Sequence, residues 1–185
     1  DELMITLKSA HEIELMRRAG KITAAARALA GEMVRLGVST KAIDQAVHDY
    51  IVSQGAKPSF LNYSGYPASV CISVNSTVIH GIPGHYILKD GDIVSVDVGA
   101  YFKGFHGDCA ATYACGSIST EAQKLIDVTR QSFFEGIRFA KKGMRVQDIS
   151  HAVQTYVESN GFAVVRSFVG HGVGRNPVSY THLRA

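Results

Sequence analysis

Apolar residues in the first third of the chain recur with the spacing of an α-helix. Ser9-Ala-His-Glu12 matches the capping-box pattern, which predicts a helix beginning near residue 10. A second helix is predicted to begin at Ser39 or Thr40 and to end at Gly55. The inward faces should consist of Ile13, Met16, Ile22, Ala26, Leu29 and Met33 in the first helix, and of Ile43, Val47, Tyr50 and Ile51 in the second.

From residue 70 the pattern changes to that of β-strands. Strands are predicted at Val70–Val74 and Ile93–Val98, and Lys103-Gly104 is a hairpin turn leading into a third strand from about His106 to Cys115. A second capping-box pattern, Thr120-Glu-Ala-Gln123, then begins a long helix that reaches toward Lys142. The order of elements predicts a mixed α and β fold.

The segment from Gly37 to Gly55 reappears 106 residues later as Gly143 to Gly161. Chance similarity of two amphipathic helices is one explanation. Two structural copies related by a pseudo-twofold axis are the preferred one. In that case the strand at 70–74 should recur at 176–180, and the chain ends at Ala185 before a full second sheet. The identical pairs are Gly37/Gly143, Ile43/Ile149, Ala46/Ala152, Val47/Val153, Tyr50/Tyr156, Ser53/Ser159 and Gly55/Gly161.

Composition excludes several classes of protein. Hydrophobic residues make up 46% of the 185 residues and charged residues 19%, as in ordinary globular domains. The net charge of +3 is scattered, so it predicts neither a specific nucleic-acid site nor a membrane surface. Three cysteines without a C-x-x-C pair favour a reducing cytoplasm over a disulfide framework. The first residues lack the pattern of a signal peptide, and Met4 is a candidate natural start.

Two aspartates are placed where strands can present them. Asp97 lies inside the apolar run Ile93–Val98, where a buried carboxylate needs a cation or a metal ion as partner. Asp108 follows on the next predicted strand, so the hairpin should bring the two carboxylates within reach of shared cations. The alternative is an aspartate that caps a turn and another that pairs with a lysine. Spacing alone does not decide between them.

Two histidines lie in glycine-flanked loops. His171 is in Val169-Gly-His-Gly-Val-Gly174, and His80 is in Ile79-His-Gly-Ile-Pro83. A single histidine is usually structural, but two beside a carboxylate pair indicate a site. Carboxylates and imidazole without thiolate favour Mn²⁺, Fe²⁺ or Co²⁺ over structural Zn²⁺. Two bridging carboxylates would suit two metal ions about 3.5–4 Å apart, and hydrolysis of an amide is the natural use of such a pair.

Several longer motifs occur together and in order. They are Leu7–Glu14 with Met16–Gly20, Tyr63–Asn75, His80–Pro83, Asp90–Val94, Asp97–Gly99, Gly104–Asp108 and Gly170–Arg175. Together they resemble the methionine aminopeptidases of bacterial type I, over residues from about 4 to 177. The resemblance implies an α+β pita-bread fold of two pseudo-twofold-related halves, which agrees with the repeat.

The resemblance also implies roles for individual residues. Asp97, Asp108 and His171 would bind two divalent metal ions (Co²⁺, Mn²⁺, Fe²⁺ or Zn²⁺), and His80 would hydrogen-bond the substrate. Tyr63, Tyr66, Cys71 and Phe60 would line the pocket for the methionine side chain, although Tyr66-Pro67 can also be only a turn and Cys71 only a small buried residue. The substrate would be the N-terminal methionine of nascent polypeptides in the cytoplasm. A monomer is the family default, and a contact with the ribosome is left open.

The end of the chain departs from the family pattern. Where the family has a second histidine followed by Glu and Pro, this chain has Val178, and His182 stands four residues late. We therefore expect a single catalytic domain at 4–177 and a foreign-looking tail at 178–185. The first half would span about 9–115 and the second, from about 116, would lack its C-terminal strands and two glutamate ligands. Three ligands of five predict weak binding of two metals and little activity of this chain by itself.

Two other functions remain open from the sequence. A prolidase-like peptidase would share the fold, but such enzymes usually carry an additional N-terminal domain. A non-catalytic pita-bread binding module would have lost its metal, and the presence of Asp97, Asp108 and His171 argues against that. Cleavage of Met-Ala-Ser against an X-Pro dipeptide separates the two peptidases, and metal uptake separates both from the binding module.

Overall fold

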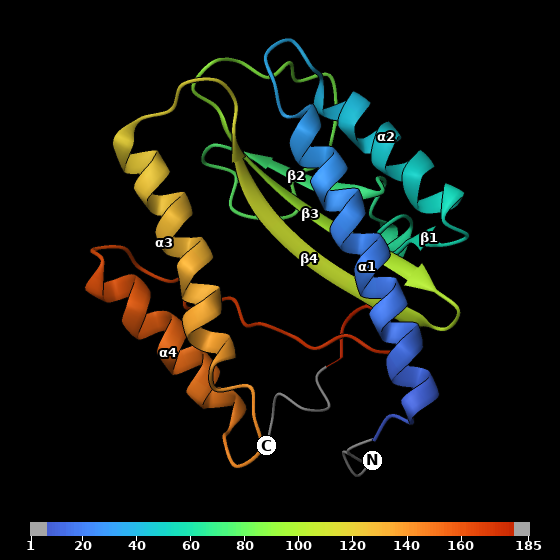
Figure 1. Ribbon diagram of the computed structural model, residues 1–185. Coiled ribbons are helices and arrows are strands. Elements are labelled where there is room, and N and C mark those ends of the chain that lie inside the picture. The colour runs from blue at the N-terminus through green and yellow to red at the C-terminus, as the bar shows by residue number, and fades with distance from the viewer. Residues whose placement is uncertain (1–6, 180–185) are drawn as a thin grey trace. The chain divides into compact units, whose positions relative to one another are not determined.

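The computed structural model describes residues 7–179, which fall into two compact units. Residues 7–118 with 173–178 form the sheet unit, and residues 119–172 with Ser179 belong to the helical unit. The predicted start at Met4 and most of the predicted tail, His182 included, lie outside the described residues. Figure 1 shows the elements of both units along the chain.

The sheet unit begins with two helices, α1 (Ala10–Met33) and α2 (Thr40–Ser53). The capping box predicted for α1 is confirmed, since the Ser9 hydroxyl accepts from the Glu12 amide and the Glu12 carboxylate accepts from the Ser9 amide. Ser39 caps α2 by accepting from the Ala42 amide. The remaining elements are β1 (Lys57–Pro58), the 3₁₀ helix η1 (Tyr63–Gly65), β2 (Val70–Val74), β3 (Ile93–Phe102) and β4 (Phe105–Ala114).

All strand pairings in the sheet involve β3 and are antiparallel. β4 pairs with β3 along its whole length, so it occupies one edge of that strand. β2 pairs with the first part of β3 and β1 with its last part, so these two share the other edge. The predicted turn joins β3 to β4, with positive φ at both Lys103 (46°) and Gly104 (95°), as two-residue hairpins require.

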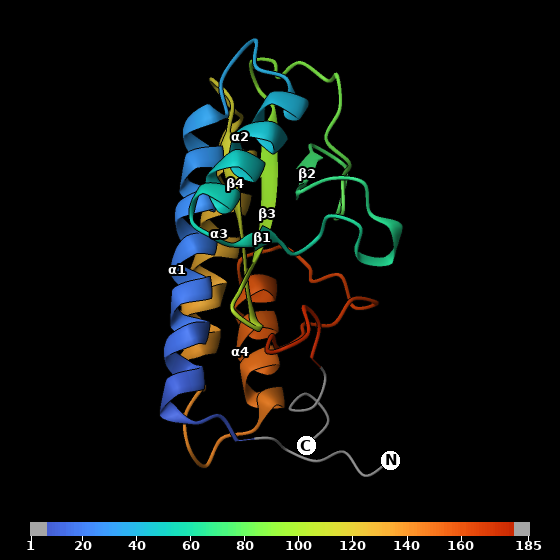
Figure 2. The ribbon, with the colours of Figure 1, turned by 90° about the vertical axis from the view of Figure 1, so that its right-hand side faces the viewer.

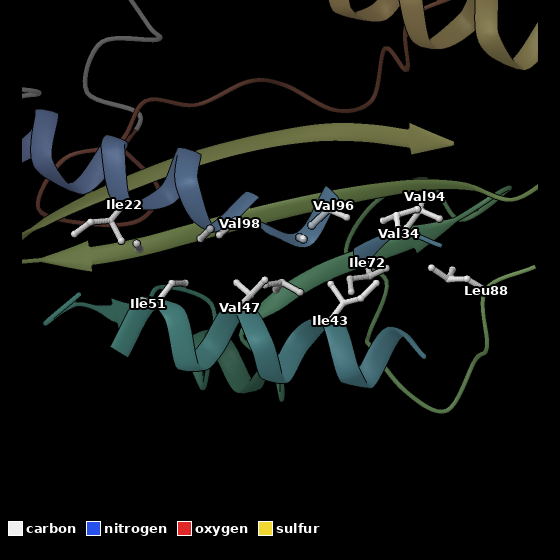
Figure 3. Packing of buried hydrophobic residues seen from close by; sticks show 14 of the residues in the cluster. Ile22, Val34, Ile43, Val47, Ile51, Ile72, Leu88, Val94, Val96 and Val98 are labelled. Carbon is white, nitrogen blue, oxygen red and sulfur yellow. The ribbon is translucent and has the colours of Figure 1, made fainter. Parts of the chain in front are cut away.

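One face of the sheet carries the hydrophobic core (Figure 3). Val94, Val96 and Val98 of β3 and Ile72 of β2 point to this face, which α1 and α2 cover. Figure 2 shows the sheet edge-on, with α1 on one side and the connection between β1 and β2 on the other. The other face therefore carries the alternate, more polar positions of the same strands.

The predicted inward face of α1 is partly wrong. Ile13 is 46% exposed, and the buried positions of this helix are Ala19, Ile22, Thr23, Ala26 and Ala30. Small residues are needed because the helix lies close to β4. A Cβ at Gly107 of β4 would lie 2.8 Å from the carbonyl oxygen of Ala19.

The helical unit contains α3 (Thr120–Ile137) and α4 (Val146–Ser159), which pack against each other. The predicted start of α3 is shifted by one residue, because Ser119 rather than Thr120 is the N-cap and accepts from the Ala122 amide. Within the described part of the second copy, residues 172 and 179 form an isolated bridge in the region where a strand at 176–180 was predicted. No helix within residues 7–179 is long and apolar enough to cross a membrane.

The repeat is confirmed at the level of the backbone. α2 and α4 have the same length of 14 residues, and their bounds differ by 106 residues (Thr40 to Val146). The glycine after each helix has positive φ, 70° at Gly55 and 87° at Gly161. The next amide in each copy donates to the same helical position, Ala56 to Ile51 and Phe162 to Val157, both at 3.2 Å.

Candidate metal and substrate site

Asp97 of β3 and Asp108 of β4 lie on the same face of the sheet, opposite the helices. Asp97 pairs with Ala110 and Asp108 pairs with Gly99, so the two aspartates are diagonal neighbours on adjacent strands. Diagonal positions are within reach of each other's side chains. The hairpin predicted from the sequence therefore brings the two carboxylates together, as expected.

The electrostatic surroundings of Asp97 are unfavourable for an unaccompanied charge. Burial raises the pKa of Asp97, and the nearby Asp108 carboxylate raises this pKa further. None of the described ion pairs involves Asp97. Its Oδ1 atom is buried and has no hydrogen-bond partner among the described residues. A buried carboxylate oxygen beside a second carboxylate fits a divalent cation, which would supply the missing partner of Asp97 Oδ1.

The aspartates are a pair and not a complete ligand set. No group of three or more His, Cys, Asp or Glu side chains within residues 7–179 is arranged to hold a metal ion. His171 belongs to the helical unit, whereas both aspartates belong to the sheet unit. Its side chain is exposed, and its Nδ1 atom lies 3.1 Å from the carbonyl oxygen of Gly172.

Three of the four predicted pocket residues lie close to the aspartates. Cys71 of β2 pairs directly with Asp97 across the strands, and Tyr66 lies near enough to Cys71 to influence the pKa of that thiol. The ring of Phe60 packs over Gly99, where a Cβ would lie 2.7 Å from a ring carbon. Tyr63, in η1, is 46% exposed.

Cys71 is suited to a pocket wall and not to a nucleophile. Burial raises the pKa of this thiol to about 11, with smaller contributions from Asp97 and Asp108. It is therefore a neutral thiol at neutral pH and behaves as a small apolar group with a weak donor. Both sequence-based interpretations of Cys71, pocket wall and buried small residue, agree with this environment.

His80 lies in the loop that follows β2 and is exposed. Its backbone has a positive φ of 57°, a conformation that is uncommon for residues other than glycine and costs about 1 kcal/mol or more. The two ends of this loop are held by buried Asp92, which accepts from the Asn75 side chain at 2.8 Å and from the Lys89 amide at 2.9 Å. The Tyr86 hydroxyl donates to the same carboxylate at 3.0 Å.

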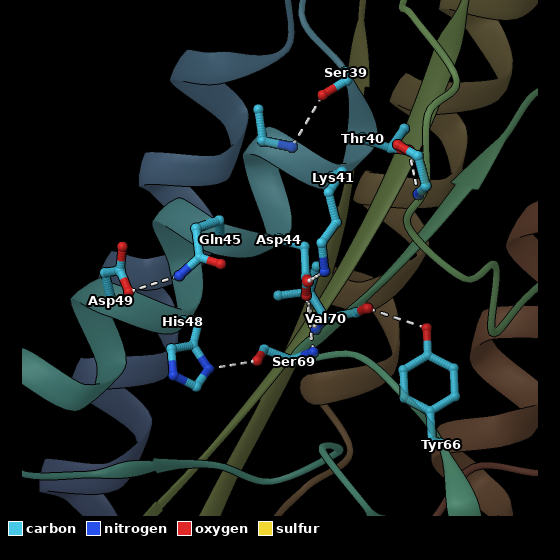
Figure 4. A network of polar contacts seen from close by, with 12 residues as sticks. Ser39, Thr40, Lys41, Asp44, Gln45, His48, Asp49, Tyr66, Ser69 and Val70 are labelled. Carbon is cyan, nitrogen blue, oxygen red and sulfur yellow. Dashed lines mark hydrogen bonds and ion pairs between the residues drawn. The ribbon is translucent and has the colours of Figure 1, made fainter.

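Sequence reasoning missed a polar network at the start of β2 (Figure 4). Asp44 of α2 is buried, and its Oδ1 accepts from the amides of Ser69 at 2.8 Å and Val70 at 3.3 Å. The Ser69 hydroxyl lies 2.8 Å from Nδ1 of His48. The only available signal was a carboxylate on the inward face of a predicted helix.

A second missed feature lies on the same face as the aspartates. His106 is two residues before Asp108 on β4, so both side chains point to that face. The Ser59 hydroxyl lies 2.8 Å from Nδ1 of His106, and burial lowers the pKa of His106. The backbone amide of His106 donates to the carbonyl oxygen of Gly174, which fixes the segment after His171 to the sheet unit.

Comparison with known proteins identifies the family of this chain. Residues 14–182 match the model of metallopeptidase family M24. The methionine aminopeptidase of Clostridium perfringens is 55% identical over 172 residues, which are 93% of this chain and 69% of that protein. The solved methionine aminopeptidase of Thermotoga maritima has a TM-score of 0.93 and 41% identity, with 95% of this chain and 71% of that chain covered.

The fold alone is shared with prolidases. The prolidase of Pyrococcus furiosus has a TM-score of 0.82 at 22% identity, and this chain covers 50% of it. The α+β pita-bread fold predicted from the sequence is therefore confirmed, and the methionine aminopeptidases are the more similar group. This chain belongs to metallopeptidase family M24, a family of metal-dependent peptidases, and within it to the methionine aminopeptidases.

Proposed function

We propose that the chain removes the N-terminal methionine of nascent polypeptides at the face of the sheet that carries Asp97 and Asp108. The observation that supports this most directly is the buried, unpartnered Oδ1 of Asp97 beside a second carboxylate. A structural carboxylate in mid-strand would have acquired a cationic or N–H partner.

The aspartates are proposed to hold two divalent metal ions, Co²⁺, Mn²⁺, Fe²⁺ or Zn²⁺, with His171 as a further ligand. Metal ions bound there would activate a water molecule and polarise the scissile carbonyl. Support for two ions comes from the four carboxylate oxygens of adjacent strands and from the family resemblance. Oxygen and imidazole ligands suit these metals.

The pocket residues are proposed to bind the methionine side chain beside the aspartates. Cys71 and Phe60 offer apolar surface next to Asp97 and Gly99, and Tyr63 and Tyr66 would complete the wall. His80 is proposed to donate a hydrogen bond to the substrate carbonyl oxygen, where a positioned donor stabilises developing negative charge. The free thiols of Cys71, Cys109 and Cys115 support the cytoplasm as the place of work.

The assay that tests the function is release of methionine from Met-Ala-Ser in the presence of Mn²⁺ or Co²⁺, with an X-Pro dipeptide as the second substrate. We expect methionine release and no cleavage of the X-Pro dipeptide. Because the described residues contain only a pair of carboxylate ligands, we expect a rate well below that of the Clostridium perfringens enzyme assayed beside it. Selectivity rather than rate is the decisive result.

The variant Asp97→Ala should reduce methionine release at least ~100-fold, as loss of a group that stabilises the transition state does. Calorimetric titration with Mn²⁺ should show binding to the original chain and none to this variant. Cleavage of the X-Pro dipeptide in preference to Met-Ala-Ser would favour the prolidase-like alternative. Absence of Asp97-dependent metal binding would favour the non-catalytic binding module.

A further inference from the structure

His80 is exposed and has a backbone conformation that a residue with a side chain rarely adopts, with φ at 57°. Such a conformation persists only where surrounding contacts hold it. The contacts that do so lie on the next residue, Gly81. Its amide donates to the Ser73 hydroxyl at 3.1 Å, and its carbonyl oxygen accepts from the Ile72 amide at 2.8 Å.

A third contact comes from Tyr66. Its hydroxyl lies 2.9 Å from the carbonyl oxygen of Gly81 and 3.0 Å from that of Val70 (the latter is drawn in Figure 4). A phenol has one hydrogen, which is shared between the two oxygens. Burial is the main cause of the strongly raised pKa of Tyr66, so its hydroxyl stays protonated and remains a donor. The phenol thus ties the His80 loop to the first residue of β2.

The backbone of Gly81 approaches β2 so closely that no other residue fits. A Cβ at Gly81 would collide with the carbonyl oxygen of Ile72 and would lie 3.0 Å from Cα of Ser73. The loop is therefore held by its backbone along the edge of β2, and the side chain of His80 leaves from a fixed point.

Ser73 and Cys71 lie on the same face of β2, because they are two residues apart on one strand. Cys71 in turn pairs with Asp97. One strand therefore positions both the wall of the proposed pocket and the attachment of His80. Ser73 is 4% exposed and offers its hydroxyl to the Gly81 amide, which places it in contact with the loop and not with a substrate.

We propose that Ser73 and the hydroxyl of Tyr66 are positioning residues that fix His80 for catalysis through Gly81. This inference rests on the proposed function, and it adds a role for Tyr66 beyond that of a pocket wall. Small displacements of a reacting group lower the rate without changing substrate binding to the same degree. The two residues should therefore affect kcat more than KM.

The kinetic test compares Ser73→Ala and Tyr66→Phe with the original chain on Met-Ala-Ser in saturating Mn²⁺. We expect kcat to fall roughly 10-fold for Ser73→Ala with KM changed less than about threefold. Ser132→Ala is the matched control, because Ser132 is similarly buried at 5% and also makes one hydrogen bond, to Thr129 in α3. This control should leave kcat unchanged.

A double-mutant cycle with His80→Ala separates positioning from a general loss of structure. If Ser73 acts through His80, Ser73→Ala should cause no further loss of kcat in the His80→Ala background. An equal loss of kcat in both backgrounds would overturn the proposal. A change confined to KM, with kcat unaffected, would also overturn the proposal.

Hydrogen exchange at the Gly81 amide gives a readout that needs no turnover. The amide should be protected in the original chain, and Ser73→Ala should accelerate its exchange at least about 10-fold, while the amides of β3 are unaffected. A protected Gly81 amide in a chain that releases no methionine would leave the contacts of Ser73 and Tyr66 with Gly81 in place and count against the proposed function. An unprotected Gly81 amide in a chain that does release methionine would count against the positioning role of Ser73 and Tyr66.

Discussion

Asp97 of β3 and Cys71 of β2 are directly opposite each other in neighbouring strands. The second carboxylate, Asp108, lies on β4, which pairs with the other edge of β3. Burial, and then the neighbouring Asp108 carboxylate, oppose the ionisation of Asp97. In the metal-free protein an ionised Asp97 therefore weakens the fold, and a metal ion at the proposed site would relieve that penalty. The proposed site and the stability of the sheet unit would then be linked through one residue.

The first prediction concerns the pH dependence of the metal-free protein. The pKa of Asp97 in the folded state is raised above its unfolded value of about 3.9. Between the two pKa values the folded state binds more protons, so its stability is lost as pH rises. Asp97→Asn should remove this loss and raise the free energy of unfolding at pH 7.5 by about 1–3 kcal/mol, with little change at pH 4.

Denaturant unfolding in EDTA at both pH values provides the measurement. The difference in free energy of unfolding between variant and original chain isolates the contribution of Asp97. Other carboxylates, Glu12, Glu135 and Glu158, have lowered pKa values, so their contribution to stability is lost as pH falls and not as it rises. A variant that is less stable than the original chain at pH 7.5 would show that the carboxylate has a stabilising partner.

The second prediction concerns the buried carboxylate that starts β2. Asp44→Ala should lower the free energy of unfolding by roughly 2–4 kcal/mol, because the amides of Ser69 and Val70 lose their buried acceptor. Asp44→Asn keeps an oxygen acceptor and should cost less. Equal losses in the two variants would instead assign the effect to the Lys41 ion pair, which is largely exposed on the lysine side.

The elements of the sheet unit were largely predictable because each has a local signal. The bounds of β2 and α2 agree with the sequence pattern, since strand alternation and a serine N-cap depend on neighbouring residues. The aspartate pair was predictable for the same reason, because a two-residue turn fixes which residues of β3 and β4 face each other. Local chemistry was enough for these features.

The missed features depend on contacts between segments far apart in the sequence. The inward face of α1 is set by how close that helix lies to Gly107, and periodicity alone favours larger residues such as Ile13. Ser73 had no distinguishing pattern and Asp44 only its place on the inward face of a helix, because their roles are defined by the backbone amides of Gly81 and Ser69. A single polar residue in a strand or helix does not reveal its partner.

The third prediction compares Gly107 of β4, which packs against α1, with Gly20 of α1, whose Cβ position is open. Gly107→Ala should lower the free energy of unfolding by about 1–3 kcal/mol, because the new methyl group would lie 2.7 Å from Oγ1 of Thr23. Gly20→Ala should raise the free energy of unfolding by about 0.5–1 kcal/mol. The Cβ of the new alanine would have no neighbouring heavy atom within 4 Å outside its own helix backbone, and alanine favours the helix. Thermal or urea unfolding of both variants checks the pair, and a neutral Gly107→Ala would show that α1 can move away from the sheet.

The fourth prediction tests whether the two copies of the repeat share their energetics as well as their backbone. Gly55 and Gly161 end α2 and α4 with φ of 70° and 87°, and neither has a heavy atom within 4 Å of its Cβ position. An alanine at either site therefore meets no clash, and its cost is the left-handed backbone alone, about 1 kcal/mol.

Gly55→Ala and Gly161→Ala should accordingly destabilise the protein by similar amounts in urea unfolding. Because the two glycines belong to different units, a tyrosine or phenylalanine signal from each unit should report which one is affected. A neutral substitution at Gly161 with a loss at Gly55 would mean that the helical unit relaxes its helix end and does not share the constraint of the first copy. Equal losses would show that the same helix-end geometry is required twice, which is what a duplicated structural unit demands.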